Sequence, residues 1–169
     1  MASAVKDHIE GLQSPIAERR LAAAEALCAL GASAGPATLK LIDALADSDE
    51  RVREAAGGAL EAIEAPPGAV VNDLAQRLTA ADSHQSFWAA TMLGRLGVEA
   101  SPAIESLARV VADEAAPLAV RQKSAWALGQ IGASAQNALP QLQQAAASDD
   151  PRLRRLARDA MQSIGTDQG

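Results

Sequence analysis

The sequence predicts an all-α fold, an α-solenoid of stacked helical hairpins with about ten helices. Apolar residues recur at helical intervals, and long β-branched runs and tight hairpin dipeptides are missing. Aromatic residues are only 2% of the chain, so the core must form by close approach of alanine-rich helices. The chain also repeats itself, because the anchor residue of each first helix recurs at spacings of 33, 33, 35 and 33: Leu27, Leu60, Leu93, Leu128 and Met161.

Other positions also recur at a fixed distance from each anchor, and each set of equivalent positions forms a column when the repeats are aligned. Three positions after each anchor stands Leu30, Ile63, Leu96, Ile131 or Ile164. The next position holds glycine in every copy except the second, which has Glu64. A leucine follows four of the anchors at one fixed distance, at Leu41, Leu74, Leu107 and Leu142. These columns describe hairpins of two amphipathic helices, which bury their apolar faces by stacking on neighbouring copies.

The repeats are expected to form one domain over residues 1–169. Residues 2–13 match a second helix without its partner, and residues 149–165 match a first helix alone. The full hairpins between these half-repeats are 14–47, 48–80, 81–114 and 115–148.

Helix starts are marked by capping residues and prolines. An aspartate that can accept backbone N–H bonds stands at the same distance before three anchors, at Asp49, Asp82 and Asp150. Ser14-Pro15 is expected to play this part in the first copy. Second helices are expected to open near prolines, which a first turn tolerates: Pro36, Pro67 and Pro102. In the fourth copy Pro140 lies three positions deeper, so that helix is expected to begin at about Leu139.

The motif residues narrow the choice among repeat families. Ankyrin repeats would show T-P-L-H and tetratricopeptide repeats a pattern of Trp, Tyr and Phe, and neither is present. Residues 49–60, 120–132 and 150–165 resemble HEAT repeats, in the short form of HEAT-like proteins related to phycobilisome lyases. The resemblance covers essentially the whole chain. It implies a right-handed solenoid (an alpha-alpha superhelix) with second helices on the concave side, but it does not define an activity.

Composition restricts partners and compartment. The formal charge of −6 and pI of about 4.9 disfavour nucleic acid as a partner. No apolar run approaches a membrane span, and the N-terminus lacks the pattern of a signal peptide. We therefore expect a cytoplasmic protein that is a monomer and has no membrane partner.

The sequence predicts no catalytic residues, no metal site and no cofactor. His8 and His84 fall in different repeats and precede Ile9 and Gln85, whereas the HEAT-like deoxyhypusine hydroxylases use His-Glu dipeptides for iron. Cys28, the single cysteine, has no histidine placed to activate it and is expected to pack inertly. A phosphate-binding G-x-x-x-x-G-K-S/T motif is also missing.

Two sets of residues are candidates for binding a partner. The first is the polar wall of the second helices, either a solvated face or a groove for a peptide: Lys40, Asp43, Asp73, Gln76, Arg77, Glu105, Arg109, Gln141 and Gln144. The second set comprises Phe87, Trp88 and Trp126. The positions equivalent to Phe87 and Trp126 in most other repeats are polar, for example Glu25 and Asp159 for Trp126. These rings either form an interface patch or fill a gap opened by the two-residue insertion around residues 113–117.

The expected function is a non-enzymatic scaffold or adaptor that binds a protein or peptide. The alternative is a bilin-lyase-type subunit that acts on a tetrapyrrole or on a protein carrying one. The HEAT resemblance is compatible with both, because unrelated activities are built on the same array.

Overall fold

The computed structural model describes residues 2–165, and within this range it is helical without strands. The first helices of the repeats are α2 (Ala17–Leu30), α4 (Glu50–Ala62), α6 (Ser83–Leu96), α8 (Leu118–Ile131) and α10 (Pro151–Gly165). The second helices are α1 (Ala2–Gly11), α3 (Thr38–Ala44), α5 (Val71–Arg77), α7 (Ile104–Ala112) and α9 (Leu139–Ala145). Seven of these helices have nine or more residues, and α3, α5 and α9 have seven each. The predicted all-α solenoid is confirmed.

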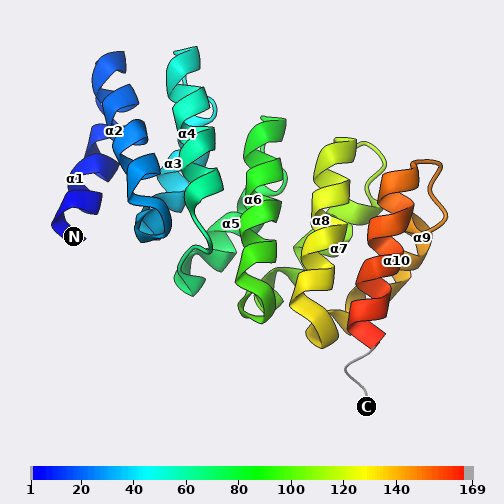
Figure 1. The fold of residues 1–169 in the computed structure, drawn as a ribbon. Helices are drawn as coiled ribbons and strands as arrows, with labels where there is room; N and C mark the ends of the chain where they lie inside the picture. Colours follow the sequence, from blue (N-terminus) through cyan, green and yellow to red (C-terminus); the bar gives the residue numbers. More distant parts are fainter. Residues whose placement is uncertain (1, 166–169) are drawn as a thin grey trace. The chain divides into compact units, whose positions relative to one another are not determined.

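The chain divides into two compact units, Met1–Pro67 and Gly68–Gly169. In the first unit α2 packs against α4, while α1 contacts α2 and α3 contacts α4. In the second unit α6, α8 and α10 pack side by side as one layer, and α5, α7 and α9 form the other (Figure 1). The predicted columns form the core of these layers. Four anchors and the four second-helix leucines are fully buried: Leu27, Leu60, Leu93, Leu128, Leu41, Leu74, Leu107 and Leu142.

Glycine is required where three first helices end. Gly31, Gly97 and Gly132 have φ values of 54°, 56° and 71°, in the region that side-chain-bearing residues rarely adopt. Each leads directly into a 3₁₀ helix: Gly31–Ala37, Gly97–Ala103 and Gly132–Ala138. The second copy lacks this glycine, and its α4 instead ends at Ile63 with extended backbone. The chain there continues to the unit boundary after Pro67, and only the short 3₁₀ segment Gly68–Val70 precedes α5.

The predicted starts of three second helices need correction. Pro67 lies before the 3₁₀ segment Gly68–Val70, and α5 begins only at Val71. Pro36 and Pro102 lie inside 3₁₀ helices rather than in the first turn of an α-helix. The α-helices begin two positions later, at Thr38 and Ile104, because these 3₁₀ turns accommodate proline and continue past it. In the fourth copy α9 begins at Leu139, as predicted.

Side-chain caps hold three first-helix starts, as predicted. Asp49 accepts a hydrogen bond from Arg51 N at 2.9 Å, Asp82 from His84 N at 2.8 Å, and Asp150 from Leu153 N at 2.6 Å. The prediction of the same role for Ser14 was wrong. The N-cap of α2 is Ile16, which has no side-chain acceptor, and Ser14 Oγ instead accepts from Ile16 N before the helix begins. Ser14 stands two positions further from its anchor than the aspartates do from theirs.

Candidate functional site

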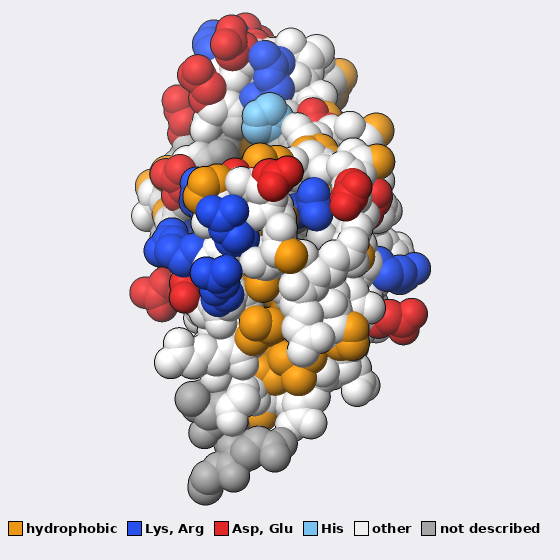
Figure 2. Space-filling model, turned by 90° about the vertical axis from the view of Figure 1, so that its right-hand side faces the viewer, with side chains coloured by type: hydrophobic (Ala, Val, Ile, Leu, Met, Phe, Trp, Pro, Cys, Tyr) orange, Lys and Arg blue, Asp and Glu red, His pale blue; other side chains and the backbone are white. Residues whose placement is uncertain are grey.

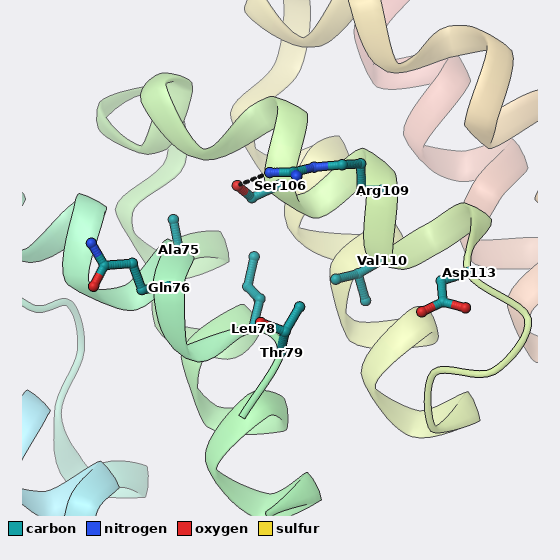
Figure 3. Close-up of a pocket in the computed structure, with 8 residues that line it drawn as sticks. All are labelled: Ala75, Gln76, Leu78, Thr79, Ser106, Arg109, Val110 and Asp113. Carbon is teal, nitrogen blue, oxygen red and sulfur yellow. Dashed lines mark hydrogen bonds between the residues drawn. The ribbon is translucent and has the colours of Figure 1, made fainter. Parts of the chain in front are cut away.

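Two hollows lie between the second helices of the Gly68–Gly169 unit. A hollow of about 470 Å³ lies between α5 and α7, and one of about 580 Å³ lies between α7 and α9. Arg109 of α7 lines both hollows, and its Nη2 donates to Ser106 Oγ at 3.2 Å (Figure 3). We call these two hollows the second-helix groove.

Several predicted residues line this groove, but others lie elsewhere. Gln76 lines the hollow between α5 and α7, with its side chain directed away from Arg109 (Figure 3). Glu105 and Gln141 line the hollow between α7 and α9. Gln144 borders a separate hollow near Glu114 and Arg121. The remaining predicted residues line neither part of the groove: Lys40 and Asp43 form an exposed ion pair of 3.6 Å on α3, and Asp73 and Arg77 lie on α5, where Arg77 Nη1 donates to the Asp73 carbonyl.

The three aromatic residues come together on the other helix layer of the same unit. Phe87 and Trp88 of α6 meet edge to face, with ring centroids 6.1 Å apart and planes at 89°. The Trp126 ring of α8 lies against the backbone of α6 at Gly94. A Cβ atom there would overlap Trp126 Cζ3 and approach Cε3 to 2.7 Å. All three side chains are half-buried, so they are neither wholly exposed nor part of the fully buried core.

Cations stand against these rings. Lys123 Nζ lies 5.0 Å from the centroid of Phe87 and 4.8 Å from that of Trp126, and Arg95 Cζ lies 5.7 Å from that of Trp88. These separations are typical of cation–π contacts. Burial, together with nearby Arg152 and Arg95, lowers the pKa of the Lys123 ammonium below its usual value.

We call this set the basic–aromatic face: Phe87, Trp88, Arg95, Lys123, Trp126 and Arg152. It contains a hollow of about 350 Å³ whose walls include Phe87, Trp126 and Leu156, with Lys123 and Arg152 beside them. Figure 2 shows basic side chains gathered on the face of the molecule that carries α10, next to hydrophobic ones. The aromatic members were predicted from the sequence, whereas Lys123 and Arg95 were not.

The histidines and the cysteine lie apart on separate helices. Within residues 2–165, no three His, Cys, Asp or Glu side chains gather so that they could hold a metal ion. His8 lies on α1 and His84 on α6. Cys28 is half-buried, with its Sγ 3.8 Å from where a Cβ of Gly58 would stand. Nor is any helix in this range long and apolar enough to cross a membrane.

Comparison with known proteins places the fold. No protein-family model matches the chain, and no curated protein matches it. An engineered protein of known structure is 24% identical with a TM-score of 0.65, and the match covers 98% of this chain and 81% of that one. A designed armadillo repeat protein in complex with the peptide (KR)4 is 16% identical with a TM-score of 0.62, over 97% and 83% of the two chains.

A natural structure is also similar. The complex of CpcE and CpcF of phycocyanin lyase from Nostoc sp. PCC7120 contains a chain that is 25% identical, with a TM-score of 0.65. The match covers 96% of this chain but only 65% of the lyase chain. The repeat columns, the two helix layers and these neighbours agree, and the protein has the HEAT- and armadillo-like α-solenoid fold.

Proposed function

We propose that the protein is a non-enzymatic scaffold that binds a segment of another protein in the second-helix groove. The observation that carries this proposal is the pair of hollows, of about 470 and 580 Å³, that are both lined by Arg109. Each hollow has a volume in the range of ligand sites. Their alignment across α5, α7 and α9 suits an elongated ligand such as a peptide or a helix.

The lining of the groove supports a polypeptide ligand. Gln76, Asn137 and Gln141, three residues with side-chain amides, are among the residues that line it. An amide can both donate and accept hydrogen bonds, and so matches the N–H and C=O groups of a peptide backbone. Arg109 and Glu105 add one charge of each sign. The designed armadillo protein in complex with (KR)4 supports a peptide as the ligand of a solenoid of this kind.

The proposal includes a monomeric scaffold in the cytoplasm, with a protein or peptide as partner rather than nucleic acid or membrane. The net charge of −6 supports this choice of partner, because it repels a phosphate backbone on average. Light scattering of the purified chain should give the mass of one copy, 17.3 kDa. A mass of two copies would contradict the monomer.

Affinity capture from source lysate tests the groove. The triple variant Gln76→Ala, Arg109→Ala, Gln141→Ala should lose captured protein at least about fivefold, because single contacts at a binding hot spot are worth about 1 kcal/mol or more. The matched control is Lys40→Ala, Asp43→Ala on α3, which should capture as the unchanged protein does. Equal capture by the triple variant, with an unchanged melting temperature, would show that the groove is not the site.

A second candidate function is a bilin-lyase-type subunit that acts on a tetrapyrrole or a chromophorylated protein. The similarity to the phycocyanin lyase chain favours it. Mixing the protein with a bilin and recording absorbance and fluorescence separates the two functions. A red-shifted, protein-bound chromophore would support the lyase, whereas an unchanged spectrum together with a captured protein would support the scaffold.

A further inference from the structure

We infer that the basic–aromatic face is a second docking surface, and that its occupant is an acidic segment of another protein that carries an apolar side chain. The face lies on the layer of α6, α8 and α10, whereas the second-helix groove lies on the layer of α5, α7 and α9. The inference therefore goes beyond the proposed function. Each surface can be tested without the other.

The net charge of this helix layer is the first observation that supports the inference. Helices α6, α8 and α10 carry seven basic side chains and one acidic one, a formal net charge of +6 in a chain whose total is −6. The basic residues are Arg95, Arg121, Lys123, Arg152, Arg154, Arg155 and Arg158, and the acidic one is Asp159. The first helices α2 and α4 carry four basic and five acidic residues, so the excess is confined to this layer.

Four of these cations fall into two groups. Arg121 and Arg154 serve the fold, because their guanidinium groups donate to the carbonyls of Val111 and Ser148 at 3.1 Å. Lys123 and Arg152 instead border the hollow between the rings. Neither of these two forms a salt bridge with a carboxylate of the described residues. They are thus available to a carboxylate from outside.

The position of Lys123 favours binding of a carboxylate. Its ammonium is held against Phe87 and Trp126, so little side-chain entropy remains to be lost when a carboxylate binds. Arg152 and Arg95 also act on it by like-charge repulsion, which an incoming negative charge would relieve. Partial burial strengthens such a pair relative to one at the open surface.

The hollow adds a place for an apolar side chain. Its volume of about 350 Å³ and its walls of Phe87, Trp126 and Leu156 suit a leucine or a similar anchor. One carboxylate, Asp150, stands near its rim. That group accepts hydrogen bonds from Leu153 N and from Gln122 Nε2 at 2.9 Å, and so serves the start of α10. A short acidic segment would meet only this face, whereas a long polyanion would also meet the net negative charge of the chain.

Intrinsic fluorescence tests the inference directly. Both tryptophans of the chain, Trp88 and Trp126, belong to this face, and the chain has no tyrosine. The probe is a peptide of three Glu-Leu-Asp-Glu repeats, titrated at low salt. We expect a saturable change in emission that salt weakens. A matched peptide with Lys in place of every acid should cause no change, and one with Ser in place of Leu should bind more weakly.

Variants identify the residues involved. Lys123→Gln and Arg152→Gln should each weaken binding about fivefold, as expected for partly exposed ion pairs. Arg109→Gln, which alters the second-helix groove, should leave it unchanged. The titration is repeated with a dye-labelled peptide, whose fluorescence anisotropy reports binding. This second readout is needed because Lys123→Gln also alters the environment of the tryptophan rings. Unchanged capture by the groove triple variant, together with intact peptide binding, would refute the proposed function alone.

Three results would overturn the inference. The first is no response to the acidic peptide up to millimolar concentration. The second is an equal response to the Lys peptide, or a tighter response to oligo-dT, which would indicate a nucleic-acid surface. The third is self-association of the chain that Lys123→Gln abolishes, because the occupant would then be a second copy.

Discussion

At the scale of single residues, Gly94 and Trp126 are the most tightly coupled pair on the basic–aromatic face. The indole of Trp126 rests where any side chain at position 94 would stand. The ring thus keeps its place over α6 only because the facing residue is glycine. Lys123 in turn rests on Trp126, so the cation position depends on this pair as well.

Gly94→Ala should destabilise the protein by about 1–3 kcal/mol, because the added methyl group overlaps the indole and forces it to move. Chemical denaturation measures the change. The control is Gly57→Ala in α4, whose nearest neighbour is Leu45 Cδ2 at 4.0 Å. That change should stabilise by about 0.5–1 kcal/mol, since alanine is the better helix former. Equal effects of the two substitutions would contradict the packing described for Trp126.

Ser124 of α8 provides a second prediction. Its hydroxyl is buried and has no hydrogen-bond partner among the described residues. Ser124→Ala removes this unsatisfied group and improves helix propensity, so we expect stabilisation of about 0.5–2 kcal/mol. Urea denaturation of the two proteins provides the comparison. A loss of stability would show that the hydroxyl has a partner after all.

The sequence could predict part of this face. Phe87 and Trp126 stood out because the equivalent positions in most other repeats are polar, for example Glu25 and Asp159 for Trp126. Lys123 also departs from the repeat pattern. The equivalent positions, five before each of the other anchors, are apolar: Ala22, Ala55, Trp88 and Leu156. Which cation meets which ring depends on side-chain packing between neighbouring helices, and periodicity does not determine that.

At the scale of elements, arginines at one repeat position link four of the first helices to the end of the second helix before each of them. These arginines stand seven positions before four anchors, and their guanidinium groups donate to backbone carbonyls: Arg20 to Ser14, Arg53 to Asp47, Arg121 to Val111, and Arg154 to Ser148. Ser86 fills the same column and donates to Ala80. The sequence carried this signal at fixed spacing, but its role required knowledge of where the second helices end.

The ion pair of Arg20 with Asp47 makes stability depend on pH. Arg20 donates to both carboxylate oxygens, at 2.6 and 2.8 Å, and thereby lowers the pKa of Asp47. A pKa that is lower in the folded state stabilises the fold above the unfolded value of about 4. This contribution should be lost as the pH falls through the folded pKa.

Asp47→Asn should therefore lower the melting temperature at neutral pH and flatten its decline in acid. Circular dichroism melts from neutral pH to about pH 2 measure both effects. Asp43→Asn, which neutralises the carboxylate of the exposed pair with Lys40, should change the stability by less than about 1 kcal/mol. Parallel acid profiles for Asp47→Asn and the unchanged protein would contradict the assignment.

At the scale of the molecule, the regular recurrence of the anchors was enough to predict the solenoid, because the same columns are buried in successive copies. The division at Pro67 was not predicted. The second repeat, just before this division, has Glu64 where the other repeats have the helix-ending glycine. The missing glycine does not reveal how the chain continues after the helix. Nor does periodicity distinguish a 3₁₀ turn from the first turn of an α-helix, which explains the displaced starts at Thr38 and Ile104.

The two units should lose structure at different concentrations of urea. Both tryptophans lie in the Gly68–Gly169 unit, whereas circular dichroism reports helices of both units. This unit contains more of the buried apolar residues, so it should unfold last. We expect ellipticity to fall before tryptophan emission changes. Superimposable transitions would show that the whole chain unfolds as one cooperative unit.

The central claim is that the second-helix groove binds a protein segment. The most direct test places a photo-crosslinking amino acid at position 76 or 141 and irradiates the protein in source lysate. Crosslinks to a protein partner should form from Gln76 and Gln141, which line the groove, and not from the control position Lys6 on α1. Crosslinks from Lys6 alone, or equal labelling from all three positions, would contradict the claim.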